Sequence, residues 1–73
     1  MEALIGLGGN LGDPPRAFAG ALAGLAPAAE VMAVSRLYRS DPEGPPQPVY
    51  TNAVARVEVR VPLPALLARC QAL

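Results

Sequence analysis

The stretch Met1-Glu-Ala-Leu-Ile-Gly-Leu-Gly-Gly-Asn-Leu-Gly-Asp13 carries the strongest structural signal in this chain of 73 residues. Its apolar run predicts a buried strand over residues 3–7 that ends at Gly8-Gly9-Asn10. The glycines after this run let the backbone approach a ligand closely. Asn10 is a polar group at the strand's exit, where open α/β sheets usually place ligands. Asp13 and Pro14 then predict the N-cap and first position of a helix.

Two nucleotide-binding motifs do not match this stretch. The dinucleotide fingerprint requires glycines at its first, third and sixth positions, and counting from Gly6 the sixth position is Leu11. A phosphate-binding loop ends in Gly-Lys-Ser/Thr, and the chain contains no lysine. A glycine-rich turn between a strand and a helix, with no ligand, therefore stays open as an interpretation.

Length and composition exclude several classes of protein. A chain of this size forms at most one small domain, which buries about 60% of its unfolded surface. Its formal net charge is zero, so no basic surface favours nucleic acid as a partner. The single cysteine, Cys70, excludes an internal disulfide and favours a reducing, cytoplasmic location. No segment approaches the roughly 20 apolar residues of a membrane span, and acidic Glu2 before the apolar run argues against a signal peptide.

The remaining pattern predicts an α+β fold. Apolar spacing indicates a helix over residues 14–25, and a strand is expected over residues 31–40. Residues 53–61 alternate apolar side chains with mostly charged ones, which predicts a sheet with helices on one face and water on the other. A last helix begins at Pro64 and places its leucines, including Leu67 and Leu73, on one apolar face. The order strand-helix-strand-strand-helix lacks the final strand of a ferredoxin-like βαββαβ domain, and its sheet is expected to be antiparallel.

The loop of residues 41–49 is rigid and ends beside two candidate ligand-binding side chains. It holds four prolines in nine residues, which favour a stiff, extended segment. Tyr50 could stack on a planar ligand while Asn52 pairs with its polar edge. In the alternative interpretation, this loop is a long connection and Tyr50 only packs on the core.

Four ordered motifs make the chain resemble the amino-terminal part of the 6-hydroxymethyl-7,8-dihydropterin pyrophosphokinase family. Two departures are Gly9, where serine is usual, and a proline-rich loop one residue shorter; a third is Asp41, where proline is common. The matched segments are Gly8-Gly9-Asn10-Leu11-Gly12-Asp13, Ser35-Arg-Leu-Tyr38-Arg39-Ser40, Gly44-Pro-Pro-Gln47-Pro48-Val-Tyr50-Thr-Asn52-Ala53 and Pro64-Ala65-Leu66-Leu67.

The resemblance implies a folate-pathway transferase that moves pyrophosphate from ATP to the hydroxymethyl group of the pterin and releases AMP. Residues 1–73 are then expected to form a single partial domain that carries the pterin pocket. In the family the pterin stacks on the tyrosine and bonds the asparagine of the Tyr-x-Asn segment, and Gln71 aligns with a glutamine that contacts ATP. The expected pterin-binding residues are Tyr50, Asn52, Ser40, Pro42, Glu43, Gly44, Gly8 and Asn10.

The family also requires Mg²⁺, whose paired aspartate ligands are expected outside this chain. No catalytic or metal-binding residue is therefore assigned within it, and the isolated chain is expected to be inactive. The expected partners are ATP and the pterin, together with self-association through an open sheet edge, and neither nucleic acid nor a membrane. The alternatives are a non-catalytic ferredoxin-like module that binds a flat heterocycle and an oligomerisation domain.

Overall fold

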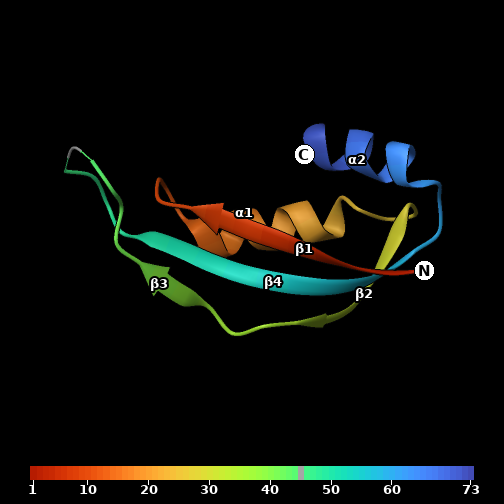
Figure 1. Cartoon of the computed structure of the whole chain (residues 1–73), viewed down its shortest axis with the longest axis horizontal. Helices are drawn as coiled ribbons and strands as arrows, with labels where there is room; N and C mark the ends of the chain where they lie inside the picture. Colours follow the sequence, from red (N-terminus) through yellow and green to blue (C-terminus); the bar gives the residue numbers. More distant parts are fainter. Residues whose placement is uncertain (45) are drawn as a thin grey trace.

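The computed structural model describes residues 1–44 and 46–73, so Pro45 of the proline-rich loop lies outside the described part. Its element order confirms the α+β, ferredoxin-like arrangement expected from the sequence, with an antiparallel sheet and two helices (Figure 1). The elements are β1 (Glu2–Gly9), α1 (Pro14–Ala23), β2 (Ala29–Val34), β3 (Tyr38–Ser40), β4 (Tyr50–Val59) and α2 (Leu63–Gln71).

The long strand β4 is the centre of the sheet. It pairs antiparallel with β1 along one side, in a register that sets Gly8 opposite Asn52. Along its other side it pairs first with β3 and then with β2, which together occupy one edge. The strand β4 therefore positions β1 and β3, the two other strands that carry expected pterin-binding residues.

The strand expected over residues 31–40 is divided in two, so its predicted continuity was wrong. The register of β2 against β4 shifts between Val31 and Ala33. Beyond that bulge, the hydroxyl of Ser35 accepts a hydrogen bond from the backbone N–H of Val54 at 2.9 Å. A side chain thus takes the place of a backbone acceptor in the ladder, and regular pairing resumes only at Tyr38.

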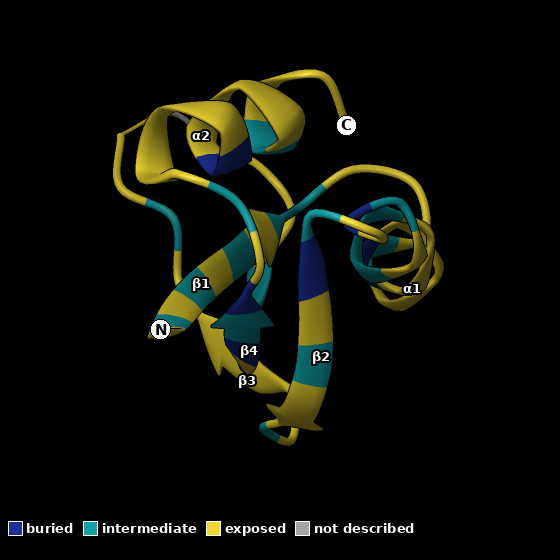
Figure 2. Cartoon of the chain, turned by 90° about the vertical axis from the view of Figure 1, so that its right-hand side faces the viewer, coloured by how far each residue is buried: buried dark blue, intermediate teal, exposed yellow. Residues whose placement is uncertain are grey.

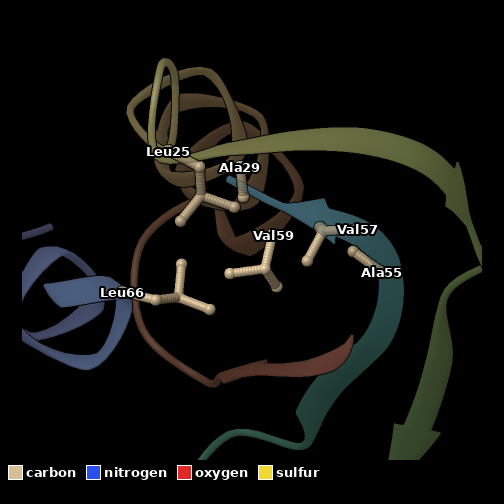
Figure 3. Close-up of a cluster of buried hydrophobic side chains, with 6 residues drawn as sticks. All are labelled: Leu25, Ala29, Ala55, Val57, Val59 and Leu66. Atoms are coloured by element: carbon tan, nitrogen blue, oxygen red, sulfur yellow. The ribbon is translucent and has the colours of Figure 1, made fainter. Parts of the chain in front are cut away.

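Alternate residues of β4 form the core under the helices. Ala55 and Val57 are completely buried, and Leu66 of α2 packs into the same cluster (Figure 3). The helix α1 begins as expected, because the carboxylate of Asp13 accepts a hydrogen bond from the N–H of Arg16 at 3.2 Å. It ends at Ala23 rather than at residue 25, yet Leu25 still enters the core and is 2% exposed.

The apolar face expected for the last helix is only partly buried. Leu66 is 6% exposed, whereas Leu67 is 60% and Leu73 is 51% exposed. Of the residues of α2, Leu66 is buried in the core cluster and Cys70 packs against that cluster. Figure 2 shows the same arrangement, with the buried part of α2 facing the sheet and most of its surface exposed.

On the face of the sheet opposite the helices, the C-terminal half of β4 carries charged side chains, which confirms the predicted solvated face. Arg56 lies 2.6 Å from Glu2, and Arg60 forms an ion pair with Glu30. The N-terminal ammonium of Met1 lies 2.7 Å from Oε1 of Glu58. Its hydrogen bond and its charge hold the pKa of the Glu58 carboxyl below the ordinary value.

The outer side of β1 is an unpaired edge among the described strands. Since Met1 accepts a backbone hydrogen bond from Val59, strand alternation directs the polar backbone groups of Leu4 and Gly6 away from β4. A mostly apolar cavity of about 550 Å³ lies between this part of β1 and α2, lined by residues that include Leu4, Leu63 and Leu67. Within the described residues, no helix is both long and apolar enough to cross a membrane.

Candidate functional site

Asn52, Ser40 and Gly8 form a cluster on the face of the sheet opposite the helices, which we call the open face. Its amide nitrogen donates a hydrogen bond to the hydroxyl of Ser40 at 2.8 Å. On the other side, its amide oxygen faces β1, where a Cβ added to Gly8 would lie 3.3 Å from that oxygen. The structure therefore brings together three of the expected pterin-binding residues, one from each of three neighbouring strands.

The absence of a side chain at Gly8 leaves one flank of Asn52 open. A contact of 3.3 Å is tighter than nearly all contacts of real Cβ atoms, so a larger residue would push the asparagine amide. One hydrogen of that amide is engaged by Ser40, and an asparagine amide has a second N–H and an acceptor oxygen. Adjacent donor and acceptor groups of this kind match the edge of a planar heterocycle.

Tyr50 begins β4 and pairs with Ser40 in the register of β3 with β4. Because side chains two residues apart share a face of a strand, Tyr50 lies on the same face as Asn52. Both side chains are half-buried. A flat molecule on this face can therefore stack on a phenol ring while it pairs with the neighbouring carboxamide.

A second aromatic residue shares this face, and the family motif that contains it assigned it no place in the site. Tyr38 is the direct cross-strand partner of Asn52, and its side chain is 51% exposed. The guanidinium of Arg36 lies over its ring, 5.6 Å from the centroid. The signal was present in the sequence, since Tyr38 and Ser40 alternate as Tyr50 and Asn52 do.

The loop of residues 41–49 is fastened to the end of β1 by side-chain amides. Asn10 donates from its amide nitrogen to Oε1 of Gln47 at 2.8 Å and to the carbonyl of Pro48 at 3.4 Å. Gln47 in turn donates to the carbonyl of Glu43 at 3.2 Å. Asn10 is thus bonded to the loop, and Gln47, known from the sequence only as a member of the motif, is its main partner.

The other loop residues expected near the pterin lie just beyond β3. Pro42 is half-buried, whereas Glu43 and Gly44 are exposed. Gly44 has a φ of +83°, a conformation that favours glycine and turns the loop back toward β4. This segment therefore follows directly on Ser40, the β3 residue that is bonded to Asn52.

Gln71 is not brought together with these residues. It is an exposed residue at the end of α2, a helix that covers the buried face of the sheet, whereas Asn52 lies on the open face. Figure 1 also shows α2 and the loop of residues 41–49 toward opposite ends of the long axis. The cavity beside α2 is likewise separate from the Asn52 cluster, which forms an open platform on the sheet.

The described residues do not form a magnesium site of their own. They contain no group of three or more histidine, cysteine, aspartate or glutamate side chains able to hold a metal ion. Asp13 caps α1, and the acids of the open face pair with Met1, Arg56 and Arg60. Within the described residues, these acids are therefore engaged by a backbone N–H or by a cation of the chain.

Comparison with known proteins gives concordant matches. The model of a family described as 7,8-dihydro-6-hydroxymethylpterin-pyrophosphokinase matches residues 4–73. The chain is similar to proteins named 2-amino-4-hydroxy-6-hydroxymethyldihydropteridine pyrophosphokinase in two bacteria. It is 40% identical over 75 residues to the one from Pseudomonas putida, covering 100% of this chain and 62% of the relative. It is 45% identical over 67 residues to the one from Synechocystis sp., covering 89% of this chain and 34% of the relative.

Proposed function

Because the chain belongs to the 7,8-dihydro-6-hydroxymethylpterin-pyrophosphokinase family, we propose that it forms the pterin-binding part of an ATP-dependent pyrophosphokinase. The reaction would transfer the terminal two phosphoryl groups of ATP to the hydroxymethyl oxygen of 6-hydroxymethyl-7,8-dihydropterin, with AMP as the leaving group. The chain spans 62% and 34% of the length of the two relatives. The activity and the substrates therefore belong to the proposal.

The observation that carries the proposal is the cluster of Tyr50, Asn52 and Ser40 beside Gly8. In this proposal the phenol ring of Tyr50 stacks on the pterin, and the free donor and acceptor of the Asn52 amide pair with its pyrimidinone edge. Ser40 holds the Asn52 side chain in place before the ligand arrives. Such pre-organisation lowers the entropic cost of binding.

The loop of residues 41–49 supplies the second wall in this proposal. Backbone groups of Pro42, Glu43 and Gly44 would face the pterin, and Asn10 and Gly8 would border the floor. Prolines at 42, 46 and 48 restrict the backbone. A loop that is already stiff loses little further freedom when the ligand binds.

The proposal places the ATP-binding and metal-binding groups largely elsewhere. In this proposal Gln71 contacts ATP, at a place separate from the Asn52 cluster. Magnesium, when bound, would neutralise charge on the phosphates of ATP, and its ligands would belong to the length of the relatives that this chain does not span. The residues of this chain would therefore bind and orient the pterin rather than move phosphoryl groups. A cytoplasmic location, expected from the single cysteine, is part of the same proposal.

Self-association through the outer edge of β1 extends the proposal to a second copy of this chain. Two copies of one strand pair antiparallel about a two-fold axis, so such an edge is complementary to itself. Leu4, which is 72% exposed, lies on that edge beside the apolar cavity under α2. A paired copy would cover both features.

Calorimetric titration with 6-hydroxymethylpterin tests the proposed binding. We expect saturable binding that Asn52→Ala weakens roughly tenfold, since one or two ligand hydrogen bonds are lost. Val54→Ala is the matched control, because Val54 shares the strand and the face and is 43% exposed. Equal affinity of the two variants would contradict the proposal.

With ATP and Mg²⁺ present, the isolated chain should release no AMP; measurable release would contradict the assignment of the metal ligands to other residues.

A further inference from the structure

We propose that Gln47 is a positioning residue that, with Asn10, holds the loop of residues 41–49 beside the Asn52 cluster. The lock is our name for the hydrogen bonds that these two side chains make with each other and with the loop backbone. This inference rests on the proposed function and gives Asn10 the further task of holding the loop, beside its place at the floor of the pterin site. It also gives Gln47 a role of its own.

The geometry that supports the lock is a chain of amide groups. Asn10 donates to Oε1 of Gln47 at 2.8 Å, and these residues are 37 positions apart in the sequence. The Nε2 group of Gln47 donates to the carbonyl of Glu43 at 3.2 Å. The oxygen of Gln47 is therefore bound to the end of β1, while its nitrogen is bound to the backbone of its own loop.

The residue types at these positions follow from the composition of the loop. Pro42, Pro46 and Pro48 have no backbone N–H, so the loop cannot extend the sheet as a regular strand. A side chain must supply the missing connection to the sheet. A carboxamide serves here because it accepts from Asn10 and donates to Glu43 at the same time.

The lock lies at the point where the loop becomes strand. Asn10 follows Gly9, which pairs with Thr51 at the end of the register between β1 and β4. Asn10 also donates to the carbonyl of Pro48 at 3.4 Å, two residues before Tyr50. Fixing this carbonyl limits the path of the backbone into Tyr50, and so limits where its ring can lie.

Hydrogen exchange and a double-mutant cycle test the lock without any ligand. A neutral hydrogen bond contributes about 0.5–1.5 kcal/mol, which corresponds to roughly a two- to tenfold change in an equilibrium constant. We therefore expect Gln47→Ala and Asn10→Ala each to raise exchange by roughly two- to tenfold at the amides of Tyr50 and Thr51, which lie in the paired part of β4. The double variant should raise exchange by less than the product of the two single effects, because each single variant already loses the bond between Asn10 and Gln47. Additive effects, or unchanged exchange, would overturn the lock.

Two further variants separate positioning from general loop damage. Gln47→Glu keeps an acceptor for Asn10 but loses the donor to Glu43, so it should retain part of the protection that Gln47→Ala removes. Val49→Ala, in the same loop and 46% exposed, is the matched control and should leave the exchange of the Thr51 amide unchanged. Equal effects of Gln47→Glu and Gln47→Ala would mean that the Asn10 bond contributes nothing.

The ligand arm distinguishes failure of the lock from failure of the proposed function. Titration with 6-hydroxymethylpterin should show affinity reduced roughly two- to tenfold in Gln47→Ala and Asn10→Ala, with the same lack of additivity. Faster exchange with unchanged pterin affinity would overturn the positioning role. An unaltered chain that binds no pterin would instead overturn the proposed function, whatever the exchange data show.

Discussion

The carboxamide of Asn52 donates a 2.8 Å hydrogen bond to the hydroxyl of Ser40, and this bond joins the central strand of the sheet to β3. It fixes one half of a side chain whose other half is open toward Gly8. The pair is exposed to solvent, so its contribution to folding is small compared with that of the core. Its consequence is the orientation of the amide on the open face.

Exchanging single glycines of β1 tests whether the space beside Asn52 matters. Gly8→Ala should weaken the binding of 6-hydroxymethylpterin at least about threefold, because the new Cβ would lie 3.3 Å from the Asn52 amide oxygen. Gly6→Ala is the matched control on the same strand and face, since nothing lies within 4 Å of its added Cβ. It should leave affinity unchanged and add up to about 1 kcal/mol of stability. Titration of both variants decides, and equal affinities would count against the assigned site.

Leucine truncations on α2 test the observed packing of that helix. Leu66→Ala should lower the free energy of unfolding by about 2–5 kcal/mol, because its side chain is 6% exposed within the core cluster. Leu67→Ala should change it by less than about 0.5 kcal/mol, since that side chain is 60% exposed. Urea denaturation followed by circular dichroism measures both. A larger loss for Leu67→Ala would show that the helix packs through its other face.

The acidic end of the pH range tests the ion pair between Met1 and Glu58. The folded pKa of Glu58 is lowered by the ammonium, so the pair contributes stability above the unfolded pKa of the carboxyl and loses it as the pH falls through the folded pKa. A nuclear magnetic resonance titration of the Glu58 carboxyl should show a midpoint below the ordinary glutamate value. Acetylation of the N-terminus should move that midpoint back upward; an identical midpoint in both forms would contradict the pairing.

A charge at the outer edge of β1 tests self-association. Sedimentation velocity should show a dimer that forms with rising concentration of the unaltered chain, because an unpaired strand edge and an apolar cavity lie side by side. Leu4→Lys should shift the population to monomer, since a lysine on an edge strand opposes pairing between copies. A monomer at every concentration, or a dimer that Leu4→Lys leaves unchanged, would remove the proposed interface.

The sequence predicted the elements whose periodicity arises from one dominant interaction. The alternation from Ala53 to Val59 reflects burial of one face of β4, and the structure follows it. The cap at Asp13 was equally clear, because its carboxylate satisfies a backbone N–H within the same turn. The break in the strand over residues 31–40 was not predictable, since it depends on Ser35 meeting the N–H of Val54, 19 residues away.

In the candidate site, too, local patterns were predictable from the sequence and contacts between distant segments were not. A family motif pointed to Tyr50 and Asn52, and β-strand alternation places them on one face. The amide chain through Asn10 and Gln47 joins segments 37 residues apart, and no local pattern encodes such a pairing. The expected burial of Leu67 and Leu73 also failed, because helical spacing defines an apolar face but not how much of it another element covers.

In the proposed complex, a pterin lies on the open face of the sheet between Tyr50 and Asn52. The most direct measurement is a nuclear magnetic resonance titration of the isotope-labelled chain with 6-hydroxymethylpterin, which detects binding even when it is weak. We expect shifts concentrated at the side-chain amide of Asn52 and at the backbone amides of Gly8, Ser40 and Tyr50. No shift at these groups up to millimolar pterin, or shifts confined to α2 and the cavity beside Leu4, would contradict the account.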